Sequence, residues 1–169
     1  MIHNNNGQIE GLLANYVDDG IICGTRNAVD YMKNMIKEDF NITEQGPLRK
    51  HLGVEYMRKH DKFGEYWEVQ LKKFRTEMLL EYEMLTGTGK KIKSYVTPGA
   101  PGKTLGANNG ETIMEAEYRK IVGKLLWSTK KDSPDCANAV RELSSYLSCP
   151  GEEHWDGISR VVGFLSSKL

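Results

Sequence analysis

The sequence Tyr16-Val17-Asp18-Asp19 stands between two short, mostly apolar stretches, residues 9–14 and residues 20–24. Two apolar runs around a short turn that contains aspartate are typical of a β-hairpin, because the Asp side chain hydrogen-bonds to nearby backbone N–H groups and so favours turns. We therefore predict a hairpin whose tip exposes the carboxylates of Asp18 and Asp19, with a regular strand on each side to keep the tip rigid.

Adjacent aspartates on a rigid turn can bind divalent metal ions. Mg²⁺ prefers oxygen ligands and usually takes only one or two carboxylates from a protein, with waters and phosphates completing its shell. Two such ions can stabilise both the attacking and the leaving oxygen of a displacement at phosphorus. The alternative is an ordinary solvent-exposed turn, since aspartate is common in turns for purely local reasons. Asp18 and Asp19 with their immediate neighbours leave both interpretations open.

Further elements follow the hairpin. Residues 28–40 carry apolar side chains at helical spacing, which predicts a helix. Residues 51–57 and 66–70 are strand candidates joined by a polar turn, so we expect a second hairpin there. Residues 72–82 again show helical spacing. These elements together predict a sheet-and-helix region over residues 1–85.

A basic, Gly-, Lys- and Pro-rich linker is expected over residues 86–111. It contains Lys90, Lys91, Lys93 and Lys103 and has no acidic residue before Glu111. A local basic stretch can bind phosphate even though the net charge of the whole chain is zero. A solvated loop is the alternative, and charge alone favours that alternative.

The rest of the chain, residues 112–169, has three amphipathic stretches at helical spacing. Thr112 and Glu115 have the spacing of a capping box for the first helix. Ser133 and Pro134 are typical of the start of the second helix, and the third is expected from about Glu152. Three such helices with short connections should form a small bundle, which makes the predicted fold class α+β.

Several classes of protein and site are not supported by the composition. Cys23, Cys136 and Cys149 are odd in number and widely spaced, so we expect neither a disulfide framework nor a cysteine metal site. The four histidines have no zinc-like spacing. No run of about eighteen apolar residues is present, so we expect no membrane span.

The motifs of this chain, taken in order, resemble those of the reverse transcriptase of copia-type LTR retrotransposons. The resemblance is collinear and covers nearly the whole chain. Each motif is weak when taken singly. The matching stretches are Tyr16-Val17-Asp18-Asp19, Leu52-Gly53-Val54-Glu55, Val96-Thr97-Pro98, Tyr118-Arg119-Lys120-Ile121-Val122-Gly123-Lys124-Leu125, and Pro150 with His154-Trp155.

The resemblance implies part of a polymerase palm built on an antiparallel sheet, followed by a helical thumb-like region that leads toward a ribonuclease H domain. It implies that Asp18 and Asp19 are catalytic ligands of two Mg²⁺ ions. Residues expected near the primer or the incoming nucleotide are Tyr16, Val17, Leu52 and Gly53, and those expected near the nucleic-acid backbone are Lys90, Lys91, Lys93 and Lys103.

The partners that the resemblance implies are an RNA or DNA template with its primer, a dNTP, and the other segments of the polyprotein. Its implied location is cytoplasmic, in retrotransposon particles, with the nucleus as a second possibility. We expect no membrane partner.

The sequence also departs from the family. The third catalytic aspartate of the family lies upstream of the hairpin and has no counterpart here, and the fingers are missing. Ser133 replaces an expected arginine, and Lys50-His51 stands where an aromatic pair is usual. We therefore expect the chain alone to be inactive as a polymerase. The alternative function is a non-catalytic retroelement remnant or a nucleic-acid-binding module.

Overall fold

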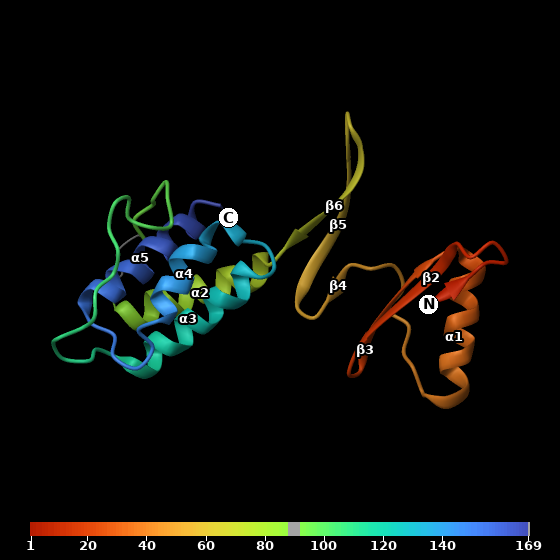
Figure 1. Cartoon of the computed structure of the whole chain (residues 1–169), viewed down its shortest axis with the longest axis horizontal. Coiled ribbons are helices and arrows are strands. Elements are labelled where there is room, and N and C mark those ends of the chain that lie inside the picture. Colours follow the sequence, from red (N-terminus) through yellow and green to blue (C-terminus); the bar gives the residue numbers. More distant parts are fainter. Residues whose placement is uncertain (88–91, 169) are drawn as a thin grey trace. The chain divides into compact units, whose positions relative to one another are not determined.

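A computed structural model describes residues 1–87 and 92–168, and the chain forms two compact units, Met1–Trp67 and Glu68–Leu169 (Figure 1). The first unit carries two small antiparallel sheets with one helix, and the second is helical. Lys90 and Lys91 lie outside the described residues. No helix in the described part of the chain is long and apolar enough to span a membrane.

The first sheet contains β1 (Ile2–His3), β2 (Ile9–Tyr16) and β3 (Asp19–Gly24) in that order. Its register pairs Gly11 with Gly24 and Tyr16 with Asp19. Side chains alternate between the two faces of a sheet, and directly opposed residues share a face. Tyr16 and Asp19 therefore lie on the face opposite to the one that carries Gly11.

Helix α1 (Arg26–Asp39) covers the Gly11 face of this sheet. The Ala28 backbone N–H donates to the Thr25 side chain, which caps the helix. Gly11 is buried, and a Cβ at this position would come within 2.6 Å of Met32 Cε. The missing side chain at Gly11 thus lets α1 approach the strand closely, with Ala28 and Met32 buried between them.

The second sheet contains β4 (Lys50–His51), β5 (Val54–Asp61) and β6 (Gly64–Gln70). His51 pairs with Val54. The turn between them consists of Leu52 (φ 48°) and Gly53 (φ 77°). A type I′ turn needs positive φ at both central residues, and Gly53 meets this need without steric cost.

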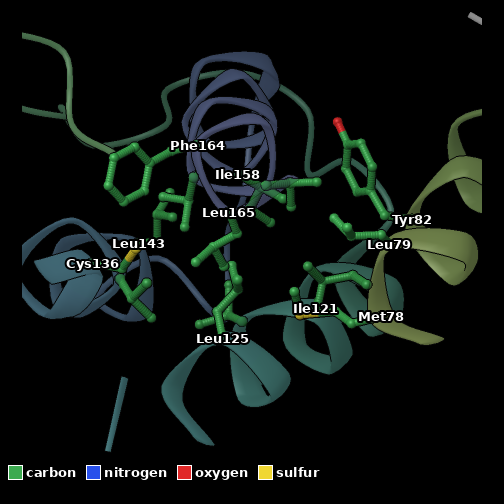
Figure 2. Close-up of a cluster of buried hydrophobic side chains, with 14 of the residues drawn as sticks. Met78, Leu79, Tyr82, Ile121, Leu125, Cys136, Leu143, Ile158, Phe164 and Leu165 are labelled. Carbon is green, nitrogen blue, oxygen red and sulfur yellow. The ribbon is translucent and has the colours of Figure 1, made fainter. Parts of the chain in front are cut away.

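The second unit contains α2 (Lys72–Thr86), α3 (Glu115–Thr129), a 3₁₀ turn (Pro134–Cys136), α4 (Ala137–Ser144) and α5 (Glu152–Ser166). Figure 2 shows side chains from all four α-helices converging on one apolar core. The fully or almost fully buried members include Met78, Tyr118, Ile121, Val122, Leu125, Val140, Leu143, Ile158, Val161, Val162 and Leu165. The three helices expected after residue 112 are thus confirmed.

Two details of the second unit differ from the sequence-based expectations. Helix α2 was expected to close the first region, but Met78, Leu79 and Tyr82 bury their side chains in the helical core of the second unit. The predicted capping box of Thr112 and Glu115 is wrong. Helix α3 begins at Glu115, and its N-cap residue is Met114, whose φ is 47°. The hydroxyl of Thr112 instead lies 3.3 Å from Cys149 Sγ.

Candidate metal-binding turn

The aspartate hairpin has the predicted position. Val17 and Asp18 form a two-residue turn between Tyr16 and Asp19, which pair across the strands. Asp18 is exposed, and the side chain of Asp19 is 40% exposed. Neither residue lies in a helix or in an apolar core, so the hairpin itself is confirmed.

The turn holds an unusual backbone conformation. Val17 has a φ of 56° and is 83% exposed. A positive φ is uncommon for a β-branched side chain and costs on the order of 1–3 kcal/mol, so it persists only where the surrounding structure imposes it. The Asn15 side-chain amide donates to Val17 O at 3.1 Å, which helps to hold the turn. The sequence alone gave no sign of this strain.

Asp19 contacts the turn between β4 and β5. The Leu52 backbone N–H donates to Asp19 Oδ2 at 3.3 Å, and His51 Nδ1 lies 3.2 Å from the same oxygen. The imidazole can pair with this carboxylate when Nδ1 carries a hydrogen. These contacts join two turns that are 33 residues apart in the sequence.

Several residues expected near the primer are thus gathered around one carboxylate. Leu52 contacts Asp19 directly, Gly53 follows it in the same turn, and Tyr16 is the strand partner of Asp19. His51 was not among the predicted site residues. The only sign of it in the sequence was that it stands where the family usually has an aromatic residue.

The carboxylates of Asp18 and Asp19 have the ligand type that Mg²⁺ prefers. Mg²⁺ is commonly held by one or two protein carboxylates, with waters and substrate phosphates in the remaining positions. Within residues 1–87 and 92–168 there is no cluster of three or more His, Cys, Asp or Glu side chains that could hold a metal ion. The turn therefore offers two carboxylates and no third protein ligand from the described part of the chain.

The two described lysines of the linker, Lys93 and Lys103, are exposed. Lys93 Nζ lies 5.3 Å from the centre of the Tyr95 ring. Lys103 lines a pocket of about 310 Å³ together with the carboxylate residues Glu142, Glu153 and Asp156. Arg160 lines the same pocket. A role of these lysines at a nucleic-acid backbone stays a prediction.

We call residues 92–113 the strap. The strap differs from a solvated linker, because side chains of the helices form hydrogen bonds with the backbone of the strap. Arg160 Nε donates to Gly99 O at 2.9 Å, and Trp155 Nε1 donates to Ile113 O at 2.9 Å. Glu142 accepts from the Leu105 N–H at 2.7 Å. The buried His154 lies with Nε2 2.9 Å from Gly106 O. The strap is thus fastened to the helical bundle.

Comparison with known proteins relates the chain to retroelement polyproteins. It is 28% identical over 153 residues to the "Retrovirus-related Pol polyprotein from transposon RE2" of Arabidopsis thaliana, covering 89% of this chain and 10% of that protein. It is 27% identical over 162 residues to the corresponding polyprotein from transposon TNT 1-94 of Nicotiana tabacum, covering 91% of this chain and 12% of that protein. A polyprotein from transposon RE1 of Arabidopsis thaliana is 27% identical over 157 residues, covering 89% of this chain and 10% of the relative.

The chain therefore spans about a tenth of the length of the curated relatives it matches. The relatives are transposon Pol polyproteins, which agrees with the copia-type retroelement that the motifs resemble. No family model matches the chain, and no solved structure matches it.

Proposed function

We propose that this chain is a segment of the RNA-directed DNA polymerase of a copia-type retrotransposon polyprotein. One observation carries the proposal. Asp18 and Asp19 lie at the tip of a hairpin in the Tyr-Val-Asp-Asp order that reverse transcriptases use. The similarity to transposon Pol polyproteins over about 90% of the chain supports it.

In this proposal the unit Met1–Trp67 is part of the palm and the helical unit Glu68–Leu169 is the thumb-like region. Asp18 and Asp19 hold Mg²⁺, which when bound stabilises charge on the attacking and leaving oxygens. Tyr16 presents its ring beside the primer end. The Leu52-Gly53 turn, which Asp19 binds through the Leu52 N–H, supports the primer strand.

The proposed activity needs parts that lie on other segments of the polyprotein. Two-metal transfer requires several carboxylates that converge on one site, and Asp18 and Asp19 provide two. The nucleotide must also be held in line with the primer end, and such positioning contributes several kcal/mol to a reaction. We therefore propose that the upstream polymerase segment provides the third aspartate and the nucleotide-binding surface.

Primer extension on an RNA template with Mg²⁺ and dNTPs tests the function. Three proteins are compared: this chain alone, the upstream polymerase segment of a related transposon Pol polyprotein alone, and the two joined in one protein. We expect extension only by the joined protein. A joined protein that folds and binds template–primer without extending it would support the alternative, a non-catalytic nucleic-acid-binding remnant. Extension by this chain alone would show that it needs no other segment.

A further inference from the structure

We infer that His51 is a positioning residue for the metal-binding carboxylate of Asp19, an inference that rests on the proposed function. His51 lies in β4 and Asp19 begins β3, so the two residues come from different sheets of the first unit. The His51 side chain is only 12% exposed, and its Nδ1 lies 3.2 Å from Asp19 Oδ2.

The two contacts to Asp19 are made on one oxygen. His51 Nδ1 and the Leu52 backbone N–H both approach Oδ2. Oδ1 accepts no hydrogen bond from the residues that the structure describes, and the side chain is 40% exposed. The carboxylate is thus fixed through one oxygen, and Oδ1 remains for a metal ion.

This arrangement is the usual way in which proteins orient a metal ligand. Ligating carboxylates are commonly hydrogen-bonded by a second layer of residues, and loss of such a partner typically lowers metal affinity by about 10–100-fold. A residue with a hydrocarbon ring at position 51 could fill the same space but could not donate a hydrogen bond. In contrast to a phenylalanine ring, His51 can therefore both fill this position and hold the Asp19 carboxylate.

The contact can be tested without any metal. Amide hydrogen exchange by NMR on the full chain measures the protection of the Leu52 N–H, and the ¹⁵N shift of the His51 ring shows whether Nδ1 carries the hydrogen. We expect Asp19→Ala to speed exchange at Leu52 about tenfold. The neighbouring Asp18→Ala is the matched control and should change exchange at Leu52 by less than about twofold. Equal exchange in both variants, or a His51 ring without hydrogen on Nδ1, would overturn the contact.

A second measurement tests positioning. Mn²⁺ replaces Mg²⁺ in a titration of the full chain, and paramagnetic broadening of the amides of residues 16–20 reports binding at the turn. His51→Phe keeps an aromatic ring and should weaken Mn²⁺ binding about tenfold. His51→Asn keeps a donor at the place of Nδ1 and should restore binding to within about twofold of the unmodified chain.

The outcomes separate this inference from the proposed function. Mn²⁺ binding that His51→Phe leaves unchanged, while Asp18→Asn lowers it, would overturn the role of His51 and leave the metal-binding turn intact. Mn²⁺ binding that neither Asp18→Asn nor Asp19→Asn lowers, or no broadening at residues 16–20, would overturn the metal-binding turn and the inference with it. Amide spectra of every variant show whether the fold is retained.

Discussion

Val17 combines a β-branched side chain with a φ of 56° at the tip of the aspartate hairpin. Relief of this strain gives a first prediction at the scale of single residues. Glycine adopts positive φ at no steric cost, so Val17→Gly should raise the free energy of unfolding of the first unit by about 1 kcal/mol, despite the greater freedom of glycine in the unfolded chain.

The same substitution in a strand is the control for Val17. Val69 lies in β6 and has no positive φ. Val69→Gly should lower the free energy of unfolding by about 0.5–1 kcal/mol, because glycine weakens a strand. Urea denaturation of each variant gives both values. Because Val69 lies in the second unit, each variant is compared with the unmodified chain in the unfolding of its own unit. If Val17→Gly destabilises the first unit as much as Val69→Gly destabilises the second, the turn is not strained.

Cysteine reactivity gives a second prediction at this scale. Burial, reinforced by Asp135, raises the pKa of the Cys136 thiol to about 12. Cys23 is exposed. The thiolate is the reactive species, so at pH 8 iodoacetamide should modify Cys23 on the order of 1,000-fold faster than Cys136. Mass spectrometry of the peptides over time measures both rates, and similar rates in the folded chain would contradict the burial of Cys136.

The raised pKa of Cys136 also sets the direction of a pH effect. Its folded-state pKa of about 12 lies above the ordinary thiol pKa of 9.0. The folded state therefore holds the proton more tightly than the unfolded state does. This contribution to stability is fully present below about pH 9 and is lost as the pH rises toward 12. A Cys136→Ala variant should lack this loss.

Interactions between residues close in sequence could be predicted, whereas interactions between residues far apart in sequence could not. The hairpin around Asp18 and Asp19 follows from residues close in sequence, and the structure confirms it. The contact of Asp19 with His51 and Leu52 was not predicted, because it joins turns 33 residues apart and no local pattern marks it. The strain at Val17 was missed for another reason. Valine rarely adopts a positive φ, so its presence in a turn does not indicate a backbone conformation of this kind.

At the scale of elements, the buried ion pair of Arg75 and Asp132 links the first turn of α2 to the loop that follows α3. Asp132 Oδ2 accepts from Arg75 at 2.6 Å and from the Leu71 N–H at 2.9 Å. Asp132 Oδ1 accepts from Ser133 at 2.8 Å. The side chains of Arg75 and Asp132 are 10% and 4% exposed. This pair holds α2 in the second unit, although the sequence had placed α2 with the first region.

Removal of Asp132 leaves the buried Arg75 without its carboxylate. Asp132→Ala should therefore lower the free energy of unfolding of the second unit by about 3–5 kcal/mol. Glu77→Ala is the control, because the Lys73–Glu77 pair at 3.9 Å is exposed and should contribute less than about 1 kcal/mol. Urea denaturation compares the two variants. Equal small effects would show that the Asp132 network does not hold α2.

The strap depends on a glycine in α5. A Cβ at Gly163 would come within 2.0 Å of Lys93 O and 2.7 Å of Tyr95 Cδ2. Gly163→Ala should therefore push the start of the strap off α5 and speed its proteolysis. Gly123 in α3 is the matched control, since nothing lies within 4 Å of a Cβ there. Gly123→Ala should leave the strap in place and stabilise the helix by up to about 1 kcal/mol. Strap proteolysis that is unchanged by Gly163→Ala would contradict this close approach.

The elements themselves were largely predictable, whereas their partners were not. The helices of the second unit follow from apolar side chains at helical spacing, and the structure confirms them. The strap was expected to be a solvated or phosphate-binding linker. Its binding to the bundle depends on polar side chains of α4 and α5, such as Glu142 and Arg160, that accept from or donate to its backbone. Apolar periodicity does not reveal contacts of this kind.

For the whole molecule, the proposed function rests on a resemblance in sequence and on the geometry of the aspartate hairpin. The chain is 27–28% identical to transposon Pol polyproteins over about nine-tenths of its length. The assignment of the two units to palm and thumb-like region stays a proposal that follows from the resemblance of the motifs. In this proposal, Asp18 and Asp19 act in catalysis only when the rest of the polymerase surrounds them.

The decisive test of the proposed polymerase function is the rate of primer extension by the joined protein. The unmodified joined protein is compared with its Asp18→Asn and Asp19→Asn variants. The control is Asp61→Asn, since Asp61 is also a turn aspartate but only accepts a local hydrogen bond from the Phe63 N–H at 2.8 Å. Metal ions contribute several kcal/mol to such reactions, so we predict that Asp18→Asn and Asp19→Asn each lower the rate by about 1,000-fold while Asp61→Asn changes it by less than about twofold. Asp18→Asn and Asp19→Asn variants that extend the primer as fast as the Asp61→Asn control would contradict the account.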